Sequence, residues 1–215
     1  MPARHITTRI SIVLGCQVWL ALSQSAQWAQ FGSDSQHSFR SPYSGPSSAA
    51  QARLYMSGGF AVAPAVSTPS VAVDGSIILC SGDAVYALDA ARGAPAWSFA
   101  PPGGFDIHMT PAVSAVGTVI VASSNGVAYG LNLSSGAELW RYQTVGHSFF
   151  SPAIGPGGRV ILSGNNASDY SRAYWYALDG NTGKLLWVSK ELGGQYASPA
   201  FSVAGDTAFI ACQAQ

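Results

Sequence analysis

Charged residues are scarce in this chain. Asp, Glu, Lys and Arg make up only 9% of its 215 residues, against roughly 25% in an average soluble protein, and the formal net charge is zero. No basic stripe is present to neutralise phosphates, which argues against nucleic acid as a partner. No phosphate-cradling glycine loop or nucleophile elbow occurs either, because the glycines fall at the turn positions of a repeat.

Apolar and turn-forming residues take the place of charge. Apolar residues make up 48% of the chain and aromatic residues 11%, which excludes a disordered protein. The 24 glycines and 12 prolines supply the chemistry of tight turns. The composition therefore predicts an all-β protein with many short connections.

The first 25 residues differ from the rest. Arg4 and Arg9 form a basic start, an apolar stretch follows, and small residues then permit cleavage after Ser25 or Ala26. This pattern predicts a secretory signal peptide over residues 1–25, too short for a spanning helix, and hence a secreted or periplasmic protein without a transmembrane span. Two alternatives remain, a lipoprotein anchor at Cys16, where "VLGC" ends, and a buried N-terminal strand.

A phrase of similar length recurs along the remaining chain. Pro69, Pro111, Pro152 and Pro199 each precede an apolar run and are spaced 42, 41 and 47 residues apart. Three tryptophans recur at similar intervals, 43 and 47 residues apart, and the fourth copy stops before its tryptophan. Repetition at this period is typical of propellers and solenoids.

Each copy contains four short apolar segments separated by turns. Runs such as "TVIVA" are apolar at consecutive positions, which indicates a strand covered on both faces of its sheet. A four-stranded antiparallel unit that cannot bury its own faces is a propeller blade. We therefore predict a lead-in segment at 26–50 and an incomplete β-propeller at 51–215. Its blades are expected at about 69–99, 111–143 and 152–189, with a partial blade at 199–215.

The turn before each tryptophan carries the most specific motif. It consists of a small residue, any residue, Asp or Asn, two further residues, a polar residue, glycine, three further residues and tryptophan. This motif resembles the tryptophan-docking repeat of the pyrroloquinoline-quinone-like (PQQ-like) β-propellers, the quinoprotein alcohol dehydrogenase-like fold. The resemblance implies docking tryptophans, glycine platforms on the neighbouring blade and turn caps. These are Trp97, Trp140 and Trp187; Gly93, Gly136 and Gly183; and Asp89, Asn132 and Asp179.

Cysteine is also scarce, with 3 in the chain. Cys80 and Cys212 fall at the same strand position in copies three units apart, too far for a disulfide. We expect both to be small buried residues in a protein held together by packing.

Catalysis is not the favoured function. The resemblance implies a quinone enzyme with calcium and a catalytic aspartate only where cofactor-binding residues are present, and such enzymes commonly show adjacent cysteines, which this chain lacks. Its only glutamates, Glu138 and Glu191, lie beside outer-strand tryptophan motifs. We therefore expect no catalytic residues, no metal and no cofactor, with PQQ and calcium as the alternative.

Polar residues gather in the loops between blades, on the face where propellers usually bind ligands. The third copy also carries extra residues from Asn165, which predict a longer loop on that face, and Asn166 begins a glycosylation triplet. Ordinary loop hydrogen bonding is the simpler interpretation of all of them. The candidate ligand-binding residues are Asp106, His108, His147, Asn165, Asp169, Tyr170, Gln195 and Tyr196, with Arg172 beside them.

The favoured interpretation is a non-catalytic protein-binding or scaffold propeller, similar in style to the family's lipoprotein that assists outer-membrane barrel assembly. Two alternatives are a fragment of a PQQ- and calcium-dependent alcohol or sugar dehydrogenase, and a carbohydrate-binding or adhesion propeller. Three blades and half of a fourth cannot close a ring. We therefore expect a fragment whose remaining blades complete the propeller, and which self-associates when isolated.

Overall fold

A computed structural model describes residues 29–30, 67–81, 83–102, 109–144, 147–166, 168–189, 191–193, 198–202 and 204–210. Within this part of the chain no helix is long and apolar enough to cross a membrane. Two four-stranded antiparallel sheets come first, each with its strands in sequence order. Their strands are β1 (Ser70–Val71), β2 (Ile77–Ser81), β3 (Ala84–Leu88), β4 (Pro95–Phe99), β5 (Ala112–Val113), β6 (Thr118–Ala122), β7 (Val127–Asn132) and β8 (Glu138–Gln143).

The third sheet has six strands, because two short strands pair beside its four-stranded core. A 3-10 turn, η2 (Pro156–Gly158), links its first two core strands. The core strands are β10 (Ala153–Ile154), β11 (Arg159–Asn166), β12 (Asp169–Asp179) and β13 (Leu185–Val188), and the additional strands are β9 (His147–Phe149) and β14 (Leu192–Gly193). A final pair consists of β15 (Ala200–Phe201) and β16 (Ala208–Phe209).

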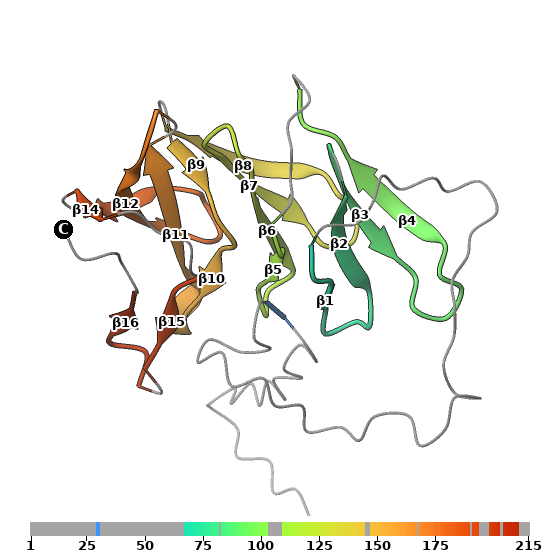
Figure 1. The fold of residues 1–215 in the computed structure, drawn as a ribbon. Coiled ribbons are helices and arrows are strands. Elements are labelled where there is room, and N and C mark those ends of the chain that lie inside the picture. Colours follow the sequence, from blue (N-terminus) through green and yellow to red (C-terminus); the bar gives the residue numbers. More distant parts are fainter. Residues whose placement is uncertain are drawn as a thin grey trace, which may run out of the picture.

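The sheets stand side by side in an arc, with the short strands β1, β5, β10 and β15 toward one edge (Figure 1). The fold is a β-propeller of four-stranded antiparallel blades, with three full blades and the first two strands of a fourth. This confirms the fold class predicted from the repeat. We call the sheets blades one to three and β15–β16 the partial fourth blade.

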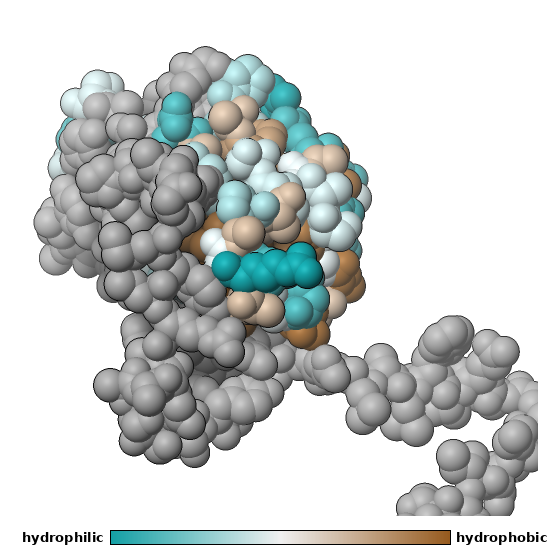
Figure 2. Space-filling view, turned by 90° about the vertical axis from the view of Figure 1, so that its right-hand side faces the viewer, coloured by the Kyte–Doolittle hydropathy of each residue, from teal (hydrophilic) through white to brown (hydrophobic). Residues whose placement is uncertain are grey.

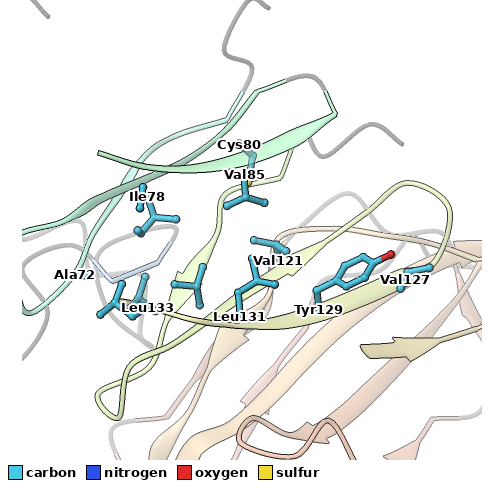
Figure 3. Close-up of a cluster of buried hydrophobic side chains, with 12 residues drawn as sticks. Ala72, Ile78, Cys80, Val85, Val121, Val127, Tyr129, Leu131 and Leu133 are labelled. Atoms are coloured by element: carbon cyan, nitrogen blue, oxygen red, sulfur yellow. The ribbon is translucent and has the colours of Figure 1, made fainter. Parts of the chain in front are cut away.

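Blades one and two share a dry core. Ile78, Cys80 and Val85 of blade one face Val121 and Leu131 of blade two (Figure 3). Cys80 is free and fully buried, as predicted, and desolvation raises the pKa of its thiol far above the ordinary value. A buried neutral thiol of this kind is a packing residue rather than a nucleophile.

Blade two is covered on both faces. All five residues of β6 are buried, and its four apolar residues alternate between two cores. Val119 and Val121 pack toward blade one, whereas Ile120 and Ala122 pack with Leu162 of blade three. The consecutive apolar run in the sequence has this cause, because side chains of a strand alternate between its faces.

The short first strands of the blades, β1, β5 and β10, are the inner strands. Buried hydroxyl groups on these strands, or just before them, connect one blade to the next. Ser70 Oγ donates to Pro111 O at 2.6 Å, and Thr110 N donates to Ser151 Oγ at 3.0 Å. A Thr or Ser precedes every repeat proline, including Thr68 and Ser198.

Ser151→Ala is expected to destabilise the fold by about 1–3 kcal/mol, because the buried Thr110 N–H loses its acceptor. Ser163 is the matched control. Its Oγ is buried and has no hydrogen-bond partner within the described ranges, so Ser163→Ala should be neutral or slightly stabilising. Urea unfolding followed by circular dichroism measures both, and an equal loss for the two variants would contradict this account.

One side of the molecule is drawn in Figure 2, turned by 90° from the first view. The described residues there mix hydrophilic and hydrophobic side chains. The large apolar residues with the highest exposed fractions include Val116 at 74%, Phe209 at 61% and Leu139 at 51%. Single exposed apolar residues such as Val116 and Leu139 are normal on protein surfaces, whereas Phe209 is followed by the exposed Ile210.

Candidate interaction site on the third blade

Two tryptophans pack each blade against the next. The ring of Trp97 on β4 lies so close to Gly136 of blade two that a Cβ there would be 2.6 Å from it, and its Nε1 donates to Leu133 O at 2.7 Å. Trp140 on β8 repeats the arrangement with Gly183 of blade three, at 2.5 Å from an added Cβ, and donates to Gly180 O at 3.0 Å. Glycine is needed at both platforms because there is no room for a side chain.

The platform turns are held by an acidic or amide side chain. Asp89 Oδ1 accepts from the backbone N–H of Ala91 and Arg92 at 2.8 and 2.9 Å. Asn132 and Asp179 accept equivalent bonds in the next two blades. The Thr182 hydroxyl also donates to Asp179 and is the main cause that lowers the pKa of that carboxyl. These side chains are therefore committed to shaping their turns.

Trp187 differs from its two counterparts. Its side chain is 46% exposed, against 7% for Trp140 at the same position of the motif. All four residues of β13 are exposed, and three of them are Leu185, Leu186 and Val188. The outer strand of blade three therefore presents an apolar surface.

A projecting hairpin distinguishes blade three. Strands β11 and β12 pair from Arg159–Asp179 out to Asn166–Asp169, beyond their pairing with the core strands β10 and β13. The inter-blade connections flank this extension, because β9 pairs with β11 at Gly164 to Asn166 and β14 pairs with β12 at Arg172 and Ala173. The extra residues from Asn165 predict a longer loop here. The added residues instead extend two strands, because the flanking segments satisfy the backbone groups of their edges.

Four polar side chains meet near the tip of the hairpin, where β12 begins, and we call them the hairpin cluster: Asp169, Arg172, Tyr174 and Glu191. Arg172 Nε lies 3.0 Å from Asp169 Oδ2, and its Nη1 lies 3.4 Å from Glu191 Oε1. Tyr174 Oη donates to Glu191 Oε2 at 2.8 Å. The cluster joins β12 to the connection that leads out of the blade.

Hydrogen bonds and neighbouring charges keep Asp169 ionised and Tyr174 neutral near neutral pH. The hydrogen bond from the Ser171 hydroxyl is the largest effect that lowers the pKa of Asp169, and Arg172 lowers it further. Donation to Glu191 raises the pKa of Tyr174, so the phenol stays neutral. The Arg172 side chain is 53% exposed, so water screens its ion pairs and they add little stability. Because the Arg172 side chain is exposed, its guanidinium is accessible to a partner.

The predicted ligand-binding residues do not form one site among the residues that the structure describes. Asp169 belongs to the hairpin cluster, whereas Asn165 is fully buried within β11, which contradicts its expected place in a loop. His147 and Tyr170 are strand residues of β9 and β12 whose side chains lie outside the described part. Asp106, His108, Gln195 and Tyr196 also lie outside the described residues.

Sequence reasoning missed Tyr174 and Glu191 as members of the cluster. Tyr174 belongs to an aromatic run that indicates a core strand, and it does pack against the core between blades two and three. Glu191 approaches Arg172 because β14 pairs with β12. No local sequence motif predicts this strand pairing.

A metal or quinone site would need converging ligands. Among the residues that the structure describes, no three His, Cys, Asp or Glu side chains form a group that could hold a metal ion. Asp89 and Asp179 cap turns, and Glu138 makes a two-point ion pair with Arg141 at 2.6 and 2.7 Å. These described carboxylates are therefore held by turns and by an ion pair.

Solved structures share this architecture. BamB from Moraxella catarrhalis is 24% identical with a TM-score of 0.53, over 65% of this chain and 41% of that one. Quinohemoprotein alcohol dehydrogenase from Comamonas testosteroni is 21% identical with a TM-score of 0.57, over 75% and 27%. A europium-containing methanol dehydrogenase is 20% identical with a TM-score of 0.61, over 81% and 33%. At these identities the similarity shows the fold alone.

One curated protein also matches. The serine/threonine-protein kinase AfsK of Streptomyces griseus is 34% identical over 119 residues, which are 53% of this chain and 14% of the kinase. The chain thus spans a small part of that relative and less than half of the solved neighbours. A family model described as outer membrane protein assembly factor BamB matches residues 81–215. Since this match covers more than half of the sequence, the chain belongs to that family of PQQ-like repeat β-propellers.

Proposed function

We propose that this propeller segment is a non-catalytic scaffold that works outside the cytoplasm by binding another protein. The observation that carries the proposal is the projecting hairpin of blade three, which presents a half-exposed arginine between two carboxylates. An arginine held in place by ion pairs is pre-organised for a partner, and arginine is enriched among residues that dominate binding energy. The family's description as an assembly factor supports a role in protein contact.

The roles of the acidic residues support a scaffold rather than an enzyme. A catalytic carboxylate must be free to exchange a proton with a substrate. Asp74 accepts from Ser76 N at 2.9 Å, and Asp206 accepts from the Ser202 hydroxyl at 2.7 Å, so these carboxylates also serve turns. The quinone dehydrogenase therefore remains the alternative that the binding experiment below must exclude.

The tryptophan contacts give the scaffold its rigidity. We infer that Trp97, Trp140 and Trp187 form one docking girdle, with Gly93, Gly136 and Gly183 as platforms and Asp89, Asn132 and Asp179 as turn caps. Within this girdle, the exposed Trp187 is the contact for a further blade. Residues 1–25 act as the signal peptide in this proposal, and sequencing the N-terminus of the exported protein tests that assignment.

Arg172→Ala is expected to weaken binding to a purified barrel-assembly component of the outer membrane about tenfold, roughly 1.4 kcal/mol. The physical reason is the loss of the charged group at the centre of the hairpin cluster. Biolayer interferometry with the immobilised full chain measures the effect.

Arg159→Ala is the matched control, because Arg159 is an exposed arginine at the opposite end of the same strand pair. Its binding should equal that of the wild type. Equal weakening by both variants would remove the hairpin from the proposal. Binding of PQQ with calcium, or of a glycan on an array, would instead favour the dehydrogenase or the adhesion alternative.

A further inference from the structure

The inner strands of blades two and three each offer a backbone N–H at the same position of the repeat. Val113 and Ile154 both lie two residues after the repeat proline. Each is the second residue of a two-residue strand, and among the described strands this strand pairs with its own blade on one side. The other edge of such a strand needs partners from elsewhere, because an unpaired buried amide is costly.

The chain's own N-terminal segment supplies those partners. Val113 N donates to the backbone oxygen of Ala29 at 2.7 Å. Ile154 N donates to Gln30 Oε1 at 2.7 Å, and Gln30 Nε2 donates back to Ile154 O at 3.4 Å. Residues 29–30 belong to the lead-in segment, 124 positions before Ile154 in sequence, and lie beside β5 at the foot of the blades (Figure 1).

The Gln30 side chain bonds the backbone N–H and C=O of Ile154, as the backbone of a neighbouring strand would. Its carboxamide has the same acceptor and donor groups as a peptide bond, so it can bond both backbone groups of one residue. Gln30 is only 4% exposed. Because both ends of its amide are used, the buried side chain avoids the penalty of an unsatisfied polar group.

We propose that the inner edges of β5 and β10 form a peptide-binding site, which recognises a backbone carbonyl and a following glutamine carboxamide. Ala29 and Gln30 occupy this site within the same chain. The ligand class is therefore a peptide with Gln at the position of Gln30. This resembles strand addition at a sheet edge, with one partner group supplied by a side chain. The inference does not depend on the hairpin cluster or on the proposed function.

Amide hydrogen exchange of the full chain, followed by NMR, tests the site. Gln30→Ala should raise the exchange rate of the Ile154 amide at least tenfold, while the buried amide of Val121 in β6 keeps its protection. Gln143→Ala, at an exposed glutamine of β8, should change neither amide. If Gln30→Ala does not fold, Gln30→Asn keeps the amide and shortens its reach, and it should expose Ile154 in the same way.

Recognition of the glutamine is tested by adding a peptide. An acetylated and amidated peptide copying residues 27–33, added to the Gln30→Ala protein, should restore protection of Ile154. The same peptide with alanine in place of its second glutamine should not. Unchanged exchange of Ile154 in the variants, or equal rescue by both peptides, would overturn the proposal.

Discussion

Gly136→Ala is expected to destabilise the protein by about 2–5 kcal/mol. A left-handed conformation costs an alanine roughly 1–2 kcal/mol, and Gly136 has φ of 71°. The added Cβ would also lie 2.6 Å from the Trp97 ring, so the indole must move away from its platform. Displacing a packed side chain in this way costs about 1–3 kcal/mol more. Urea unfolding followed by circular dichroism measures the sum.

Gly117→Ala separates the two contributions. Gly117 lies in the same blade with φ of 85°, but an added Cβ there would meet only Leu133 Cβ at an ordinary 3.8 Å. This control should lose only the conformational part, about 1–2 kcal/mol. If both variants lost the same stability, the close approach of Trp97 would have no energetic role.

Trp140→Ala is expected to cost about 3–5 kcal/mol, as large-to-small changes of buried aromatic residues do. The indole is 7% exposed, lies over Gly183 and donates to Gly180 O. Its loss would leave a cavity between blades two and three and an acceptor without its donor. Urea unfolding at low protein concentration, followed by far-ultraviolet circular dichroism, measures the change without relying on tryptophan fluorescence.

Trp187→Ala is the control with the same residue and the same place in the motif. Because that indole is 46% exposed, its removal should cost less than about 2 kcal/mol. Equal losses at Trp140 and Trp187 would show that the contact with the next blade is not the source of the stability.

The repeat allowed the fold to be predicted because its residues meet needs of the blade itself, such as covered strand faces and tight turns. The apolar run Thr118–Ala122 indicated two covered faces, and the structure buries all five residues. Tryptophan, glycine and proline recur at similar intervals, which indicated one unit repeated in space. Such features depend on neighbours in sequence or in the adjacent copy, where periodicity is informative.

The candidate site was harder to predict because its contacts join distant segments. Asn165 was expected in a loop but is buried in β11, since β9 and β12 pair with it on either side. Glu191 reaches Arg172 through the pairing of β14, and Gln30 bonds a residue 124 positions away. A polar residue with a tertiary partner carries no periodic signal. Its role becomes visible only when the strands are placed.

Site-specific photo-crosslinking tests the central claim of a protein-binding scaffold most directly. A photoreactive amino acid at Ser171, an exposed residue of the projecting hairpin, should form an adduct with a barrel-assembly component of the outer membrane. The same group at Asn181, exposed in the turn that follows β12, should form none. Equal adducts at both positions, or none at Ser171, would contradict a scaffold that binds its partner through blade three.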